Sequence, residues 1–211
     1  MIKHYYTPEA CQPAEPNTSW LHSLFFYTVK SLEKLGSKHP FLSDAYFRFF
    51  YQNMLRDEIS LSGIQPGMNV AHVGCGALPM TAISLARAGA RVTAVDLDPE
   101  ALSHAEKPIT RLGLQDKITL YSGCGTKLNF AQYDAVWLSL HVRPVDRILK
   151  RAMDMLPDQG KIVMREPRGA LRSYYPGAEQ LVRSSNFECC AKDQILGKTS
   201  LVLTKKDLST N

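Results

Sequence analysis

The chain lacks the features that mark membrane and secreted proteins. Its longest apolar stretch, around residues 20–29, is far shorter than the roughly 20 residues that a membrane-spanning helix needs. Pro8, Pro13 and Pro16 interrupt the region where a signal peptide would carry an apolar core. We therefore expect a cytoplasmic protein that has no membrane partner.

Patterns for metal binding, disulfides and nucleic-acid binding are missing as well. The 5 cysteines form no CxxC pair, and the 6 histidines show no HExxH spacing. Lysines and arginines are scattered, and the formal net charge is only +5, so no nucleic-acid partner is expected. We predict neither a metal site nor a disulfide framework, and the chemistry must come from other residues.

The chain is long enough for one large domain with a small appendage. Residues 1–18 are polar and rich in proline, which is typical of a tail or surface arm. Apolar residues recur at helical spacing over residues 21–35, and a second helix, dense in aromatic rings, is expected from about residue 44 to 60. These segments predict an N-terminal arm and helical lid over residues 1–65, followed by the main domain over residues 66–211.

From Asn69 onward, short apolar runs alternate with helix-length segments. The runs are NVAHV, RVTAV, KITLY, YDAVWL, KIVMR, FECCA and SLVLT. This alternation predicts right-handed crossovers and a seven-stranded, mostly parallel sheet with helices on both faces. The short connection between the last two runs indicates an antiparallel hairpin. The expected architecture is α/β, the Rossmann-like fold of class I enzymes that use S-adenosylmethionine (SAM).

A glycine loop follows the first of these strands, in the sequence VAHVGCGALPMT. Gly74 and Gly76 have no side chain, so the backbone can turn tightly and approach a ligand. Asp96 ends the second strand about 20 residues later, where its carboxylate can accept hydrogen bonds from both ribose hydroxyls. Asp98, just before Pro99, is the better candidate for a helix N-cap. Gly74, Gly76 and Asp96 therefore predict a nucleotide site.

The loop favours SAM over a dinucleotide. Pro79 takes the place of the third glycine of GxGxxG and removes a backbone donor that a pyrophosphate would need. A sulfonium nucleoside has no phosphate to neutralise. Cys124 and Gly125, after the third strand, are expected beside the adenine. Further residues assigned to the cofactor site are Cys75, Leu97 and Leu138.

Three carbons on the sulfur of SAM are open to attack, and the sequence bears on which one reacts. Amide and amine methylases of this fold commonly carry an Asn/Asp-Pro-Pro-Tyr signature after the fourth strand. Here that place reads LSLHVRP. Many methyltransferases lack this signature, so its absence is only weak evidence against methyl transfer.

The loop GCGALPMTAI resembles the GxGPLPLTSI loop of nicotianamine synthases, and the resemblance extends over roughly residues 45–205. MREPRGALRSYYP and GKTSLVLTKK are similar to two further segments of that family, and a tyrosine seven residues before a glutamate matches as well. The residues placed by these matches are Tyr51, Glu58, Arg165, Tyr175 and Ser200. The resemblance implies use of the aminocarboxypropyl arm of SAM, with release of methylthioadenosine.

The chain departs from nicotianamine synthases in ways that favour a smaller relative. Cys124 replaces their adenine-side acid, Arg172 lies one residue closer to the tyrosine, and only about 65 residues precede the sheet. The azetidine-2-carboxylate synthases are short proteins of similar fold in which the amino group of SAM attacks its own γ-carbon. Their pattern of polar residue, tyrosine and serine is similar to Ser139, Tyr175 and Ser200.

The physical chemistry permits this ring closure without a strong base. An α-amino group has a pKa of about 7.7–8.0, and a nearby sulfonium lowers it. The enzyme must mainly align nitrogen behind the carbon–sulfur bond. Ser139, Ser200 and Tyr175 are expected to hold the amine. Aromatic faces, from Tyr46, Phe50 or Tyr51, are expected to steady the cation, and Arg165 to bind the carboxylate.

The first hypothesis is therefore a cyclase that uses SAM as its substrate, without a metal, and makes azetidine-2-carboxylate. Aminocarboxypropyl transfer to an amine, small-molecule methyl transfer and SAM binding without catalysis are the alternatives. His72 is predicted to be a core histidine, while His141 is a further candidate proton acceptor. The sequence leaves the oligomeric state open, a homodimer included.

Overall fold

The computed structural model describes residues 3–4, 51–168, 181–182, 185–194 and 198–207. The expected first helix and the candidate site residues Tyr46 and Tyr175 lie outside these residues. Within the part of the chain that is described, no helix is long and apolar enough to cross a membrane.

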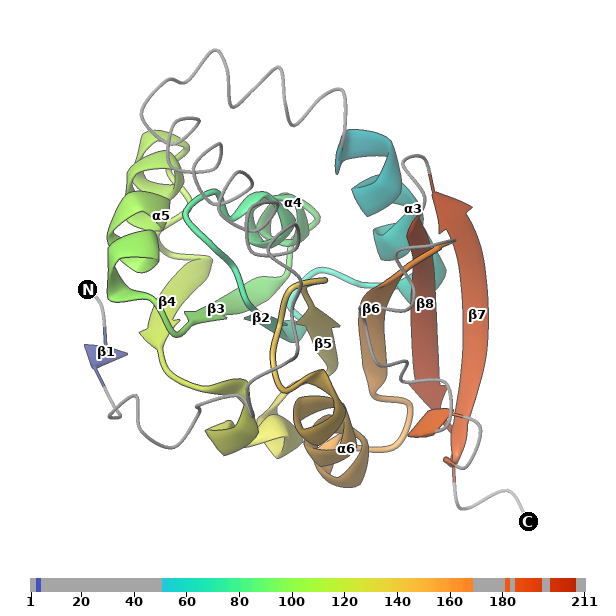
Figure 1. Cartoon of the computed structure of the whole chain (residues 1–211). Coiled ribbons are helices and arrows are strands. Elements are labelled where there is room, and N and C mark those ends of the chain that lie inside the picture. The colour runs from blue at the N-terminus through green and yellow to red at the C-terminus, as the bar shows by residue number, and fades with distance from the viewer. Residues whose placement is uncertain (1–2, 5–50, 169–180, 183–184, 195–197, 208–211) are drawn as a thin grey trace.

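A mixed sheet of eight strands forms the centre of the molecule (Figure 1). Its spatial order is β1-β4-β3-β2-β5-β6-β8-β7. The strands are β1 (Lys3–His4), β2 (Asn69–Val73), β3 (Arg91–Asp96), β4 (Ile118–Ser122), β5 (Ala135–Leu138), β6 (Lys161–Pro167), β7 (Phe187–Gln194) and β8 (Lys198–Lys205). All seven predicted strands are present, and β7 and β8 pair antiparallel as expected. The two-residue edge strand β1, parallel to β4, was not predicted.

Helices cover both faces of the sheet, as the alternating pattern predicts. They are α3 (Gln52–Ser62), α4 (Met80–Arg87), α5 (Pro99–Arg111) and α6 (Val145–Met155), with short 3-10 turns η3 (Gly125–Lys127) and η4 (Phe130–Gln132). Helices α3, α4 and α5 lie on one face and α6 on the other (Figure 1). Asp98 caps α5 by accepting from Glu100 N and Ala101 N, which confirms its predicted N-cap role. Gly63, at φ 62°, ends α3.

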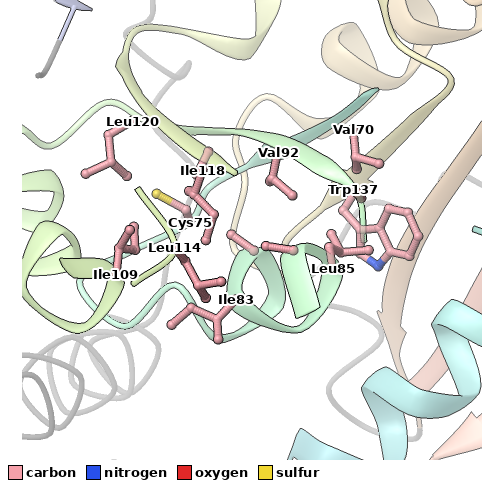
Figure 2. Close-up of a cluster of buried hydrophobic side chains, with 14 of the residues drawn as sticks. Val70, Cys75, Ile83, Leu85, Val92, Ile109, Leu114, Ile118, Leu120 and Trp137 are labelled. Carbon is pink, nitrogen blue, oxygen red and sulfur yellow. The ribbon is translucent and has the colours of Figure 1, made fainter. Parts of the chain in front are cut away.

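Two apolar clusters hold the sheet between these helix layers. On the α4 and α5 side, Val70, Val92 and Trp137 of the sheet belong to one cluster with Ile83 and Leu85 of α4 (Figure 2). The second cluster lies on the α6 side. Each large side chain fully buried in this way contributes roughly 1.5–3 kcal/mol. Because both faces of the sheet are packed against helices, its strands hold the loops at the carboxyl edge in place.

Candidate active site

A cavity of about 400 Å³ opens at the carboxyl edge of the parallel strands, where ligands bind in open α/β sheets. Five neighbouring strands each bring one polar or glycine position to its wall. In spatial order from β3 to β8 these are Asp96, Gly74, Ser139, Arg165 and Lys198. Strand β8 runs antiparallel to β6, so its first residue, opposite Pro167, lies at this same edge.

The glycine loop is shaped by backbone conformations that favour glycine. Gly74 has a φ of 80° and Gly76 a φ of 64°. A Cβ on Gly74 would lie 2.5 Å from Val142 Cγ2 and 3.2 Å from Ser139 Cβ. The missing side chain therefore allows the loop after β2 to lie against the loop after β5, and both loops line the cavity.

Asp96 ties the loop to the tip of β3. Its Oδ2 accepts from Gly76 N at 2.7 Å and its Oδ1 from Asp98 N at 3.0 Å. Burial raises the pKa of the Asp96 carboxyl, and the hydrogen bonds from backbone amides partly oppose that rise. Each carboxylate oxygen keeps a lone pair, so Asp96 can still accept hydrogen bonds from a vicinal diol in the cavity.

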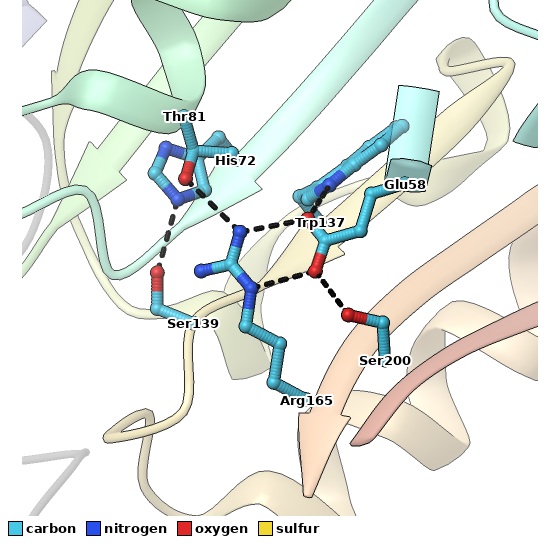
Figure 3. A network of polar contacts seen from close by, with 7 residues as sticks. All are labelled: Glu58, His72, Thr81, Trp137, Ser139, Arg165 and Ser200. Atoms are coloured by element: carbon cyan, nitrogen blue, oxygen red, sulfur yellow. Dashed lines mark hydrogen bonds and ion pairs between the residues drawn. The ribbon is translucent and has the colours of Figure 1, made fainter. Parts of the chain in front are cut away.

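A buried ion pair lies beneath the other end of the cavity (Figure 3). Arg165 donates from Nε to Glu58 Oε1 at 2.8 Å and from Nη2 to Glu58 Oε2 at 2.7 Å. Ser200 Oγ donates to Glu58 Oε1 at 2.7 Å, and Trp137 Nε1 to Oε2 at 3.3 Å. Glu58 is fully buried and does not line the cavity. It holds the guanidinium of Arg165, which does line it.

This network changes the assignment of Ser200. The sequence predicts that its hydroxyl holds the reacting amine. In the structure Ser200 is fully buried, donates to Glu58 and lies outside the cavity wall. Its hydroxyl supports the Glu58–Arg165 pair. Arg165 retains one amino group, Nη1, for which no hydrogen bond is found in the described part of the chain.

His72 lies in the cavity wall next to Ser139. Its Nε2 lies 3.0 Å from Ser139 Oγ, while Nδ1 is buried and has no partner in the described structure. Burial, assisted by the charge of Arg165, lowers the His72 pKa to about 3, so the ring is neutral. A buried acceptor without a partner is tolerated better than a buried N–H. We therefore assign the proton to Nε2, which leaves the Ser139 hydroxyl proton free to meet a ligand.

His72 makes the stability of the fold depend on pH. Its folded-state pKa of about 3 lies below the ordinary 6.5, so only the unfolded chain takes up a proton as pH falls below 6.5. Between pH 7.5 and pH 5 we expect a loss of about 2 kcal/mol in unfolding free energy from this residue. Urea denaturation at both pH values should show a loss about 2 kcal/mol smaller in His72→Gln. Equal losses would contradict a buried, neutral imidazole.

Tyr51, at the start of α3, lies between two cations. Its ring centroid is 6.0 Å from Arg165 Cζ and 5.8 Å from Lys198 Nζ. Burial and the nearby Arg165 charge lower the pKa of Lys198, and the carboxylate of Glu58 opposes that effect. Lys198, which also lines the cavity, was not predicted from the sequence. It could have been found from strand alternation, because it precedes Ser200 by two residues and so shares its face of the sheet.

The cavity brings together most of the described residues that the sequence assigned to the site. Those lining it are Tyr51, Gly74, Cys75, Gly76, Asp96, Leu97, Gly125, Ser139 and Arg165, and His141 lines it as well. Pro79 is the N-cap of α4 and Leu138 is part of the core; neither lines the cavity. Cys124 is buried beneath the wall, 3.0 Å from Thr126 Oγ1. It is disulfide-bonded to a partner outside the described residues, a bond that the sequence analysis did not predict.

The order and direction of the strands and helices are those of the class I fold of SAM-dependent methyltransferases. A family model described as "Methyltransferase domain" matches residues 70–160, from β2 to just before β6. The matched segment contains Gly74, Gly76 and Asp96. The predicted fold class is therefore confirmed.

The chain is also similar to individual proteins. The L-histidine 2-aminobutanoyltransferase of Yersinia pestis is 30% identical over 164 residues, which cover 76% of this chain and 60% of the relative. The chain thus spans about 60% of the length of that relative. A variant of the nicotianamine synthase MtNAS in complex with SAM has a TM-score of 0.75 at 20% identity, covering 88% of this chain and 76% of MtNAS.

The same fold carries other activities. A putative rRNA-methylase from Clostridium thermocellum has a TM-score of 0.61 at 19% identity, covering 72% of this chain and 94% of the methylase. Structural likeness at such identities establishes the fold alone. Among these relatives, the curated one is named for transfer of an aminobutanoyl group. The comparisons therefore favour the transfer alternative over the ring closure that the sequence analysis preferred.

Proposed function

We propose that this chain transfers the 3-amino-3-carboxypropyl group of SAM to an amine acceptor and releases 5′-methylthioadenosine. The observation that carries the proposal is the extent of the cavity, which runs from Asp96 on β3 to Lys198 on β8. Four strand spacings of about 4.8 Å separate these positions, roughly 19 Å in all. That length leaves room for a second substrate beside SAM.

The direction of the cavity suits attack on the γ-carbon. With the ribose at Asp96 and the backbone of Gly74 to Gly76 beneath the nucleoside, the aminocarboxypropyl arm extends from β2 toward Ser139 and Arg165. Nη1 of Arg165, for which the described residues offer no hydrogen bond, and the hydroxyl of Ser139 can donate to the arm's carboxylate. An acceptor that enters from the Lys198 side then approaches the arm rather than the adenine.

The proposed step is a single displacement. The nitrogen lone pair of the acceptor forms a bond to the γ-carbon, the carbon–sulfur bond breaks, and its electron pair goes to sulfur. The sulfonium becomes the neutral thioether of 5′-methylthioadenosine, and the amine proton passes to water or to His141 at the cavity wall. The chain contributes chiefly by aligning the two reactants, which can supply up to roughly 7–11 kcal/mol.

Product analysis tests the proposal. Purified protein is incubated with SAM alone and with SAM plus L-histidine, the acceptor in the name of the Yersinia relative, or plus a mixture of amino acids and amines. We expect 5′-methylthioadenosine to form only when an acceptor is present, with a product heavier than the acceptor by the aminocarboxypropyl group. S-adenosylhomocysteine would overturn the proposal in favour of methyl transfer. 5′-Methylthioadenosine with azetidine-2-carboxylate from SAM alone would support the cyclisation predicted from the sequence instead.

A further inference from the structure

We propose that Lys198 binds the carboxylate of an α-amino acid acceptor. This inference rests on the proposed function and specifies the chemical class of its second substrate. It assigns Lys198 a role in selecting amino acids over simple amines. The basis is the position of Lys198 in the cavity, its surroundings and the balance of charge around it.

The position of Lys198 places it beyond the reach of the arm of SAM. Four bonds join the sulfur of SAM to its carboxyl carbon and reach roughly 5 Å, about one strand spacing. From a sulfonium above β2 and β5, the arm therefore ends near Ser139 or Arg165. Lys198 lies one strand further, on β8, and still lines the same cavity. Its ammonium is left for the second substrate.

The surroundings of Lys198 hold it in place without neutralising it. Its Nζ lies 5.8 Å from the Tyr51 ring centroid, and no hydrogen bond or ion pair of its ammonium occurs within the described residues. Tyr51 therefore restricts the side chain while its three N–H donors remain available. An ammonium prepared in this way matches a carboxylate, which accepts hydrogen bonds from cations strongly.

The charge balance also calls for an anion. Within the described chain, Arg165 on β6 and Lys198 on β8 line this end of the cavity, and the buried carboxylate of Glu58 lies behind Arg165. Glu58 is matched by Arg165 through two hydrogen bonds, so the charge of Lys198 is left over. The ammonium of Lys198 is partly buried and lies near the charge of Arg165, which is unfavourable unless an anion binds beside it. A bound carboxylate would remove that cost, whereas a simple alkylamine would add to it.

Equilibrium binding tests this inference separately from catalysis. L-Histidine and histamine, which lacks the carboxylate, are titrated calorimetrically into protein saturated with 5′-methylthioadenosine. We expect L-histidine to bind at least tenfold more tightly than histamine. Lys198→Met should abolish most of that preference, while Lys198→Arg should retain it. A second pair, L-ornithine and putrescine, extends the test to another side chain.

Lys192→Met provides the matched control. Lys192 lies on neighbouring strand β7, is exposed and pairs with Asp57 at 2.9 Å, so its loss should leave the preference intact. The inference is wrong if the wild-type protein binds the amino acid and its decarboxylated amine equally well, or binds neither. It is also wrong if Lys198→Met keeps the wild-type preference for the amino acid. Weaker binding of SAM in Lys198→Met with the preference intact would also overturn it, by assigning Lys198 to the arm. If the protein prefers ligands with a carboxylate but releases no 5′-methylthioadenosine in the product analysis, the role of Lys198 is supported and the proposed aminocarboxypropyl transfer is wrong.

Discussion

Replacement of Glu58 by alanine should lower the free energy of unfolding by about 3–5 kcal/mol, the usual cost of leaving one member of a buried ion pair unpaired. The Arg165 side chain is only 7% exposed and its partner is fully buried. Without Glu58, the contacts of the guanidinium within the described residues are the 3.4 Å contact with Thr81 Oγ1 and the Tyr51 ring. The donors of Ser200 and Trp137 also lose their acceptor. Urea denaturation followed by far-UV circular dichroism measures the loss.

Two further variants show whether the ion pair causes the effect. Glu58→Gln keeps the shape and one acceptor oxygen, so we expect an intermediate loss. Asp57→Asn, on the same helix, breaks the more exposed pair with Lys192 and should cost at most about 1 kcal/mol. A Glu58→Ala loss no larger than that of Asp57→Asn would contradict the role of Glu58 as the support of Arg165.

Replacement of Asp96 by asparagine should weaken SAM binding roughly 10- to 150-fold and change the stability of the fold much less. Hydrogen bonds to a charged acceptor contribute roughly 1.5–3 kcal/mol each, and asparagine keeps only one of the two oxygens. Burial raises the Asp96 pKa, so the ionised carboxylate costs folding energy at neutral pH. Asparagine also leaves Gly76 N or Asp98 N without its acceptor oxygen, which opposes the gain from removing the charge, so the melting temperature should change little. Calorimetric titration with SAM and thermal denaturation measure the two effects.

Asp134→Asn is the matched control for this experiment. Asp134 also accepts from a backbone amide, Asn69 N at 2.7 Å, but at the amino edge of β2, away from the cavity. The Asp134→Asn substitution should leave the affinity for SAM unchanged. If Asp96→Asn bound SAM as tightly as the wild type, the carboxylate would serve only to join the glycine loop to β3, and the assigned ribose contact would be wrong.

The elements that local chemistry determines were predicted well from the sequence. Each of the seven strands is a short apolar run whose neighbours in the chain are helical or turn-forming, so its identity needs no knowledge of distant contacts. Gly63 ends α3 and Asp98 begins α5 through interactions within a few residues. The glycine loop and Asp96 were found for a similar reason, because both follow predicted strands directly.

The network beneath the cavity could not be predicted in the same way. Glu58 meets Arg165 across 107 residues and Ser200 across 142, and no local pattern encodes such pairs. The family resemblance placed all three residues but not their contacts, so Ser200 was assigned to the amine and Glu58 was given no role. Strand β1 was missed because a two-residue strand is specified by its neighbour β4, not by its own sequence.

The choice between ring closure and transfer depends on whether a second substrate binds, and the residues that would bind it form no recognisable sequence motif. The departures from nicotianamine synthases, such as Cys124 and the position of Arg172, favoured a smaller relative and hence a cyclase. The cavity instead spans five strands and includes Lys198, a residue that a reaction of SAM with itself does not require. The proposed acceptor site thus arises from the pairing of β8 with β6, which single-sequence reasoning did not resolve.

Double labelling of SAM tests the central claim most directly. SAM that carries deuterium in its methyl group and ¹³C in its carboxyl group is incubated with the protein and L-histidine, and the products are identified by mass spectrometry. If the γ-carbon is attacked by the acceptor, the ¹³C appears in the modified amino acid and all the deuterium stays in 5′-methylthioadenosine. Deuterium in the modified amino acid, with ¹³C retained in S-adenosylhomocysteine, would contradict the account.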